Sequence, residues 1–137
     1  MRIVLVLTVI LLCACSPSMD YSSQNLSAGW SHDEVVRISL SEEDRSASEV
    51  NIVVDHDISY GYQNLYLVMT TSGETSSTDT ISLQLADNRG SWLSPCRSDH
   101  CLFTYPVEVD NSVTDISIAQ YSREDVLKGI NQIGIKL

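Results

Sequence analysis

The stretch NLYLVMTTSGETSSTDTISLQL, residues 64–85, decides the fold. In each half, apolar residues stand at every second position: first at 65, 67 and 69, then at 81, 83 and 85. A period of two is typical of a β-strand that buries one face. Between the halves, Ser72-Gly73-Glu74 has the composition of a turn. The stretch therefore predicts two strands joined by a turn.

The same alternation recurs in five other places along the chain. The apolar sets are Val36, Ile38 and Leu40; Val50, Ile52 and Val54; Cys101, Phe103, Tyr105, Val107 and Val109; Ile116 and Ile118; and Ile133, Ile135 and Leu137. Seven half-buried strands linked by turns predict an all-β domain over residues 28–137. We expect an antiparallel β-sandwich of about seven strands, immunoglobulin-like or jelly-roll-like.

Two local signals modify this prediction. Pro106 lies inside the fifth run and cannot donate a ladder hydrogen bond, so that strand should be an edge strand or be bulged there. Ser122 and Asp125 form a weak variant of the capping box. One short helical turn is therefore expected near the C-terminus, ending near Gly129.

The N-terminus has the features of a lipoprotein signal. Arg2 precedes an apolar run, residues 3–12, which is shorter than the roughly 20 residues needed to span a bilayer. The run ends in Leu-Leu-Cys-Ala-Cys, where the small residue Ala14 precedes Cys15. We expect residues 1–14 to be removed and Cys15 to carry palmitate-type acyl chains, with residues 15–27 as a flexible tether. The alternatives are lipidation of Cys13 and a buried N-terminal element.

The charge is strongly acidic. The chain has 18 acidic residues against 8 lysines and arginines, a formal net charge of −10. This balance argues against nucleic acid or anionic lipid as a partner. No basic cluster follows Cys15, so acyl chains must supply the membrane attachment. The sequence does not indicate an oligomeric state.

Two cysteines, Cys96 and Cys101, remain outside the signal and the lipidation site. In an exported chain they predict a disulfide, worth about 2 kcal/mol in the chain-entropy model. Two free thiols are the first alternative. A metal site that includes His100 is the second, although it lacks a fourth ligand.

The sequence offers no recognisable catalytic constellation. The His/carboxylate clusters are His32-Asp33-Glu34 and Asp55-His56-Asp57. Consecutive strand residues point to opposite faces, so neither triplet converges on one ion. There is also no nucleophile elbow, metalloprotease helix motif or phosphate-binding glycine loop. We predict a protein that is not an enzyme and has no catalytic residue, metal or cofactor.

Three tyrosines are candidate ligand contacts. Tyr60, Tyr62 and Tyr66 lie at or near the start of the 64–85 stretch. Exposed aromatic side chains on a sandwich can stack on sugars or anchor a protein partner. The alternative is that they only cover the second face of a half-buried sheet.

Several separated motifs resemble one protein family. Residues 61–93, GYQNLYLVMTTSGETSSTDTISLQLADNRGSWL, resemble the gliding-motility lipoproteins of the GldH type from Bacteroidetes. The likeness is carried by Gly29-Trp30, Asn64-Leu65, Asp79-Thr80, Leu85-Ala86-Asp87, Gly90, Trp92-Leu93, Arg123-Glu124-Asp125, Gly129-Ile130 and Ile133-Gly134-Ile135. It spans most of the mature chain and includes the signal.

The resemblance implies a non-catalytic accessory component of the envelope machinery for gliding motility, linked to type IX secretion. Such a protein would be anchored in the cell envelope, with the outer membrane expected, and would act by binding other envelope proteins. Within the motif, Asp87, Gly90 and Trp92 are expected to have a structural role: a hairpin turn with a tryptophan packed beside it. The alternative function is a cell-surface glycan-binding module that uses Tyr60, Tyr62, Tyr66 or Trp92.

Overall fold

Two antiparallel sheets packed face to face form the protein. The computed structural model describes residues 21–46 and 48–137. The five-stranded sheet has the order β1 (Tyr21–Asn25), β11 (Ile130–Lys136), β4 (Glu49–Asp57), β8 (His100–Glu108) and β7 (Cys96–Arg97). The four-stranded sheet has the order β3 (Val36–Ser39), β9 (Val113–Gln120), β5 (Asn64–Gly73) and β6 (Ser77–Gln84). A short ladder joins β10 (Val126–Leu127) to β2 (Trp30–Ser31).

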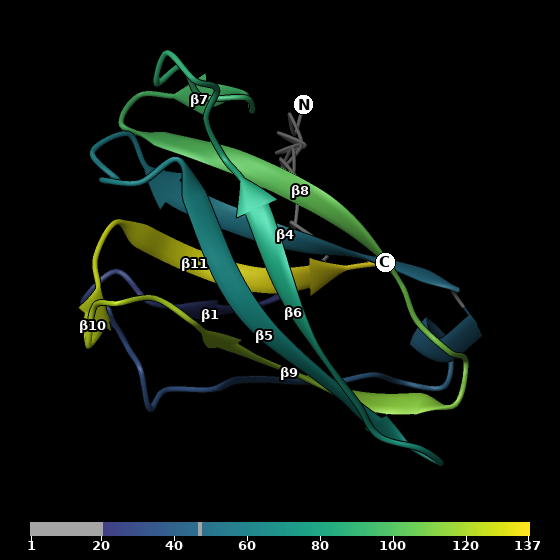
Figure 1. Cartoon of the computed structure of the whole chain (residues 1–137). Helices are drawn as coiled ribbons and strands as arrows, with labels where there is room; N and C mark the ends of the chain where they lie inside the picture. The colour runs from purple at the N-terminus through teal and green to yellow at the C-terminus, as the bar shows by residue number, and fades with distance from the viewer. Residues whose placement is uncertain (1–20, 47) are drawn as a thin grey trace, which may run out of the picture.

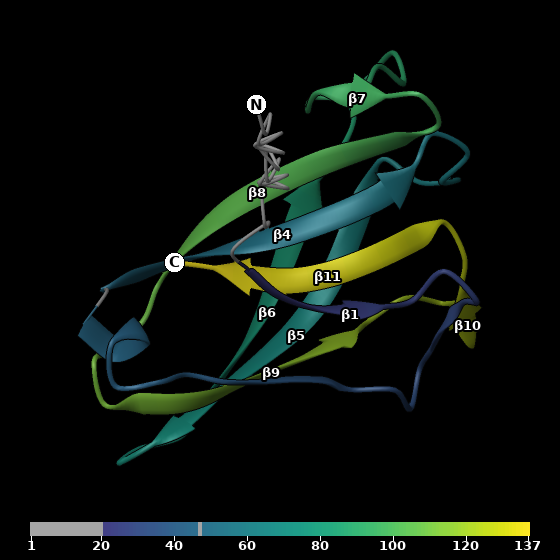
Figure 2. The same cartoon turned by 180° about the vertical axis from the view of Figure 1, so that it is seen from behind.

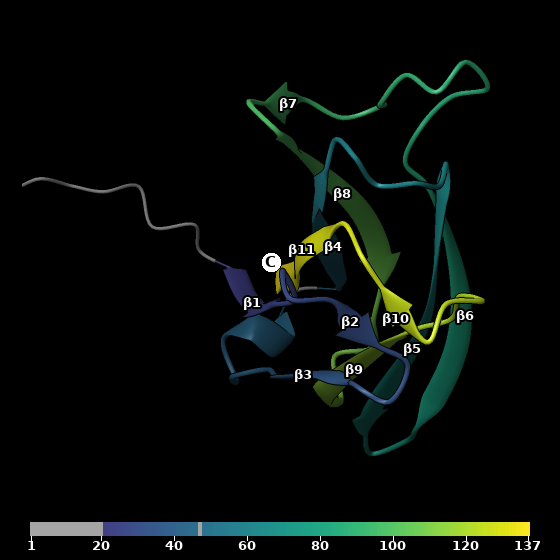
Figure 3. The same ribbon diagram turned by 90° about the vertical axis from the view of Figure 1, so that its left-hand side faces the viewer.

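The sheets form two layers, with β1 and β6 on opposite sides of the molecule (Figure 3). In Figure 1, β5, β6 and β9 lie in front, and the view from behind in Figure 2 brings β1, β11, β4 and β8 forward. The predicted antiparallel β-sandwich is therefore confirmed. Each of the seven alternating runs forms one of the longer strands: β3, β4, β5, β6, β8, β9 and β11.

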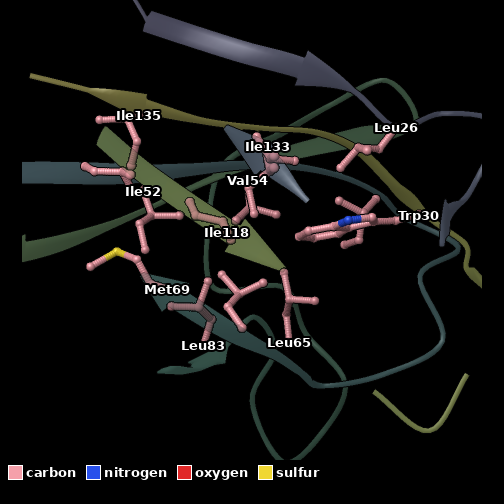
Figure 4. Packing of buried hydrophobic residues seen from close by; sticks show 14 of the residues in the cluster. Leu26, Trp30, Ile52, Val54, Leu65, Met69, Leu83, Ile118, Ile133 and Ile135 are labelled. Atoms are coloured by element: carbon pink, nitrogen blue, oxygen red, sulfur yellow. The ribbon is translucent and has the colours of Figure 1, made fainter. Parts of the chain in front are cut away.

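The core lies between the sheets and is made of the alternating apolar residues (Figure 4). Ile52 and Val54 of β4 and Leu65 and Leu67 of β5 all belong to this core, and all four are almost completely buried. Trp30 closes one end of this core, and its indole Nε1 donates to the carbonyl oxygen of Glu34 at 2.8 Å. That bond satisfies the one polar atom of the buried indole ring.

Pro106 lies where β8 is an open edge, as the sequence predicted. The two-residue β7 pairs only with His100 and Cys101, so no strand covers the far side of β8 at Pro106. The bond from the Ile58 N–H to the carbonyl of Asp99 fixes the alternation of the β4–β8 ladder. It makes Pro106 and Asn51 a non-hydrogen-bonded pair, so the missing N–H of Pro106 faces the open edge.

The prediction that residues 15–27 form a flexible tether is wrong for the second half of this segment. Residues 21–25 form β1, which pairs with β11 from Tyr21↔Lys136 to Asn25↔Gln132. Leu26 follows as a buried core residue, and its N–H donates to the carbonyl of Asn131. A polar segment can form an edge strand because its neighbour β11 supplies the apolar contact, and this hid β1 from the sequence pattern. Residues 1–14, Cys15 and the first part of the tether lie outside the described residues.

The expected helical turn near the C-terminus is also wrong. Residues 126–127 form β10, because Leu127 is buried in the core and the segment pairs with β2. The helical turn of the described residues is η1 (Asp44–Ser46), a 3-10 turn. There Ser41 N–H donates to the Asp44 carboxylate and Asp44 N–H donates to the Ser41 hydroxyl. Ser41 and Asp44 therefore form the two reciprocal hydrogen bonds of a capping box. The similar sequence pattern at Ser122 does not form a helical turn, because the following residues pair with β2 instead.

Over residues 21–46 and 48–137, no helix is long and apolar enough to cross a membrane.

Candidate functional site

A cleft of about 930 Å³ opens at one end of the four-stranded sheet. It lies between the segment that leads into β5 and the loop that follows β9. We call it the tyrosine cleft. Its lining is Tyr60, Gly61, Tyr62, Gln63, Asn64, Tyr66, Thr80, Tyr121, Ser122, Arg123 and Glu124. The lining combines aromatic rings with amide, hydroxyl and charged groups, which is the composition of a polar recognition site.

Three tyrosines of the cleft are open to solvent. Their exposed fractions are 48% for Tyr62, 43% for Tyr66 and 61% for Tyr121. The Tyr62 hydroxyl donates to the Glu124 carboxylate at 2.6 Å, which fixes the ring across the cleft. This hydrogen bond to a carboxylate raises the pKa of the Tyr62 phenol, because the bond requires the phenol proton. Tyr62 is therefore held as a neutral, oriented ring.

Tyr60 is not an exposed ligand-face residue, and that expectation is wrong. Its side chain is 6% exposed, and its hydroxyl donates to the backbone carbonyl of Asn64 at 3.0 Å. Burial raises the pKa of the Tyr60 phenol far above its ordinary value. Its ring lies edge-on to that of Tyr62, with centroids 5.7 Å apart. Tyr60 thus forms the floor that supports the exposed Tyr62 ring.

Gln120 holds the opposite wall of the cleft. This buried side chain donates from Nε2 to the carbonyls of Trp30, at 3.4 Å, and Glu124, at 3.1 Å. Its Oε1 accepts the N–H of Ser122 at 2.8 Å. Sequence reasoning missed both Gln120 and Tyr121. The sequence does contain a signal for Gln120. This residue follows the inward-facing Ile116 and Ile118 at the same spacing of two, so a polar side chain is placed where the strand is buried.

The residues 87–92 form a tight turn next to the cleft. The Asp87 carboxylate accepts the N–H groups of Arg89 and Ser91, both at 2.9 Å. Gly90 has φ +82°, a conformation that favours glycine. The side chain of Gln63 donates to the carbonyl of Asp87 at 3.0 Å, so this turn is tied to the lining of the cleft.

The predicted disulfide between Cys96 and Cys101 is formed. It joins β7 to β8 at directly opposed positions. Next to it, His100 Nδ1 lies 3.2 Å from the Asp55 carboxylate, which also accepts a hydrogen bond from Asn131. The disulfide therefore shapes a loop near the end of β4.

The two His/carboxylate clusters do not converge. His56 is buried and faces Trp92, while Asp57 accepts the N–H of Ser59 in a turn. Across the described part of the chain, no group of three or more His, Cys, Asp or Glu side chains is arranged to hold a metal ion.

Comparison with known proteins identifies the family. The model of the GldH lipoprotein family matches residues 19–137. The chain belongs to the GldH lipoprotein family. It is thus a lipoprotein associated with gliding motility, with a lipid-anchored location in the cell envelope. No curated protein matches the chain, and no solved structure does.

Motifs that are far apart in this GldH-family sequence meet at the tyrosine cleft. Asn64, Thr80 and the pair Arg123-Glu124 come from three of the segments that carry the resemblance, and all line the cleft. The turn at Asp87 adjoins them through Gln63. Three of the segments that carry the resemblance therefore meet at one surface feature.

Proposed function

We propose that this GldH-family lipoprotein is a non-catalytic accessory component of the gliding machinery, linked to type IX secretion. Acyl chains on Cys15 would hold it in the outer membrane, and the domain would act by binding other envelope proteins. The observation that carries the proposal is the family match, which extends over residues 19–137 and so includes the whole sandwich. The net charge of −10 supports it, because an acidic domain stays away from anionic headgroups and free to meet protein partners.

The tyrosine cleft is the proposed contact surface. Protein interfaces are enriched in exposed tyrosine and arginine, and Tyr62, Tyr66, Tyr121 and Arg123 all line this cleft. Tyr62 is already oriented by Glu124 and supported by Tyr60. Little side-chain entropy of Tyr62 would therefore be lost when a partner covers this ring.

Deletion of the gene in the source organism tests the function. We expect loss or slowing of cell spreading together with reduced protein secretion, both restored by the wild-type gene. A Cys15→Ser gene should fail to restore them, and mass spectrometry of the native protein should find acyl mass on Cys15. Normal spreading and normal secretion in the deletion strain would refute the proposal.

Variants of the cleft test the contact surface. A Tyr62→Ala/Tyr66→Ala gene should restore the deletion strain poorly. A Tyr105→Ala gene is the matched control, because Tyr105 is also exposed but lies on β8 of the other sheet. Equal restoration by both genes would remove the cleft from the proposal.

A second candidate is a glycan-binding function of the same cleft. Tyr62, Tyr66 and Tyr121 offer flat rings on which sugars could stack. The nearby side chains of Gln63, Asn64 and Glu124 offer donors and acceptors for sugar hydroxyls. Affinity gels and a glycan array with the purified protein test it. Retention that the Tyr62→Ala/Tyr66→Ala variant loses and the Tyr105→Ala variant keeps would favour the glycan; no retention would exclude it.

A further inference from the structure

β6 is an open edge of the four-stranded sheet. It pairs with β5 on one side, from Asn64↔Gln84 to Thr71↔Ser77, without a register shift. On its other side the sheet ends. An open edge presents backbone donors and acceptors that another extended chain can use.

The direction of these groups follows from one hydrogen bond. The Leu85 N–H donates to the Gln63 carbonyl at 2.7 Å, directly beyond the Asn64↔Gln84 pair. Hydrogen-bonded and non-hydrogen-bonded pairs alternate in an antiparallel ladder. The N–H and C=O groups of Thr78, Thr80 and Ser82 therefore point away from β5. No other described residue bonds to these backbone groups.

The other sheet edges are shorter than β6 or blocked by proline. β1 has five residues, β3 has four and β7 has two, against eight in β6. The open side of β8 contains Pro106, whose nitrogen cannot donate. β6 runs for eight residues with no proline, lysine or arginine and no bulge. Its one charged residue, Asp79, has the same inward phase as Ile81 and Leu83. An inward charge disfavours pairing with an apolar or acidic strand, so this long and regular edge is selective for a strand that brings the opposite charge.

We propose that β6 accepts an extended, basic segment of another envelope protein as an additional strand. This inference rests on the proposed function and names its partner's conformation and charge. A second copy of this chain is the less favourable occupant, because it would bring a further net charge of −10. β6 itself carries the acidic Asp79 and no basic residue, which favours a basic segment.

The tyrosine cleft would add selectivity to this pairing. Thr80 and Ser82 are opposite Val68 and Tyr66 in the β5–β6 ladder, so these side chains share the solvent face of the sheet. Thr80 also lines the cleft together with Tyr66. A long cationic side chain opposite Thr80 on the added strand would extend across β6 towards the Tyr66 ring, where a cation–π contact is available.

Photo-crosslinking of the full-length protein in its native host tests the proposal. A benzophenone amino acid is placed at Ser82, and in a matched strain at Arg37 on β3, the opposite edge of the same sheet. We expect a protein adduct from Ser82 and none from Arg37. Mass spectrometry of the adduct should locate the crosslink in an extended segment with an excess of lysine and arginine. No adduct from Ser82, an adduct with a second copy, or a crosslink in a helical or acidic segment would overturn the proposal.

Two variants then test the strand pairing itself. Thr80→Pro removes an outward N–H without removing a β5 ladder bond, and Thr80→Val keeps that N–H as the control. We expect the Ser82 adduct to fall at least tenfold with Thr80→Pro and to stay within twofold with Thr80→Val. An unchanged adduct with Thr80→Pro would contradict strand addition.

A second variant covers the case in which Thr80→Pro does not fold. Thr78→Lys/Thr80→Lys changes only exposed side chains and should also reduce the adduct at least tenfold, because lysines repel a basic segment. Failure of this inference is distinct from failure of the proposed function. A deletion strain that does not spread, restored fully by a Thr80→Pro gene that folds, would refute strand addition alone.

Discussion

The imidazole ring of His56 packs against the indole ring of Trp92, with centroids 4.5 Å apart and a tilt of 56°. This contact joins β4 of one sheet to the turn that follows β6 of the other. His56 is fully buried, and its Nδ1–H donates to the carbonyl of Asp57 at 3.1 Å. Its Nε2 has no hydrogen-bond partner among the described residues. A charged imidazole would leave an unpaired N–H in this site, so the neutral ring is favoured.

Stability should fall in mild acid because of His56. Burial lowers the pKa of this imidazole below its ordinary value of 6.5, against the opposing charges of Asp55 and Asp57. As pH falls through about 6.5, His56 therefore binds a proton in the unfolded chain before it does so in the folded chain. The stability due to neutral His56 is therefore complete above pH 6.5 and is lost as pH falls below it. Urea unfolding between pH 5 and 8 measures this loss.

The matched variants for that measurement are His56→Phe and His32→Gln. His56→Phe keeps a ring beside Trp92 but cannot titrate, so its stability relative to wild type should increase as pH falls from 7 to 5. His32 is exposed, so His32→Gln is the control for the loss of a histidine outside the core. Parallel pH curves for wild type and His56→Phe would show that His56 does not titrate on unfolding.

Gly73 should not tolerate a side chain. A Cβ at this position would collide with the backbone carbonyl of Ser112, at the point where the β5–β9 register shifts. We expect Gly73→Ala to lower the free energy of unfolding by about 1–3 kcal/mol, as overpacking does elsewhere. Gly61→Ala is the control, because a Cβ there meets nothing within 4 Å. Its effect should stay within about 0.5 kcal/mol, and equal losses for the two variants would contradict the steric explanation.

Removal of Gln120 should loosen the wall of the tyrosine cleft. Gln120→Met fills a similar volume but leaves the Ser122 N–H and the Glu124 carbonyl without their partner. We expect a loss of about 1–3 kcal/mol and faster hydrogen exchange of the Ser122 amide. Gln84→Met, at an exposed position on β6, should do neither. Unchanged exchange at Ser122 in Gln120→Met would rule out this positioning role.

The Cys96–Cys101 disulfide should stabilise only modestly. The closed loop is short, with a sequence separation of 5, so little chain entropy is removed from the unfolded state. Cys96→Ala/Cys101→Ala should lower the free energy of unfolding by about 2 kcal/mol. Wild type with a reducing agent should show a similar loss. A domain that fails to fold without the bond would indicate a larger structural role.

Local alternation was enough to predict the seven longer strands, but not β1 or the pairing of β10. The runs at Leu65–Leu67 and Leu83–Leu85 carry their burial pattern in the sequence, because period two puts apolar side chains on one face. β1 has no such pattern, since its polar residues are held by β11. The capping pattern at Ser122 is equally local, but pairing of Leu127 with Trp30 outweighs it.

The sequence by itself predicted the sandwich, the acidic charge and the family resemblance, and it favoured a disulfide over two free thiols or a metal site, because each of these depends on residue type and spacing. Only the tertiary structure decided that Tyr60 is buried, that Tyr121 joins Tyr62 and Tyr66 in a cleft, and that β6 is an open edge. These features depend on strand order and register, which arise from contacts between residues far apart in the chain. The wall held by Gln120, for example, requires β9 and β2 to meet, and no local pattern encodes that meeting.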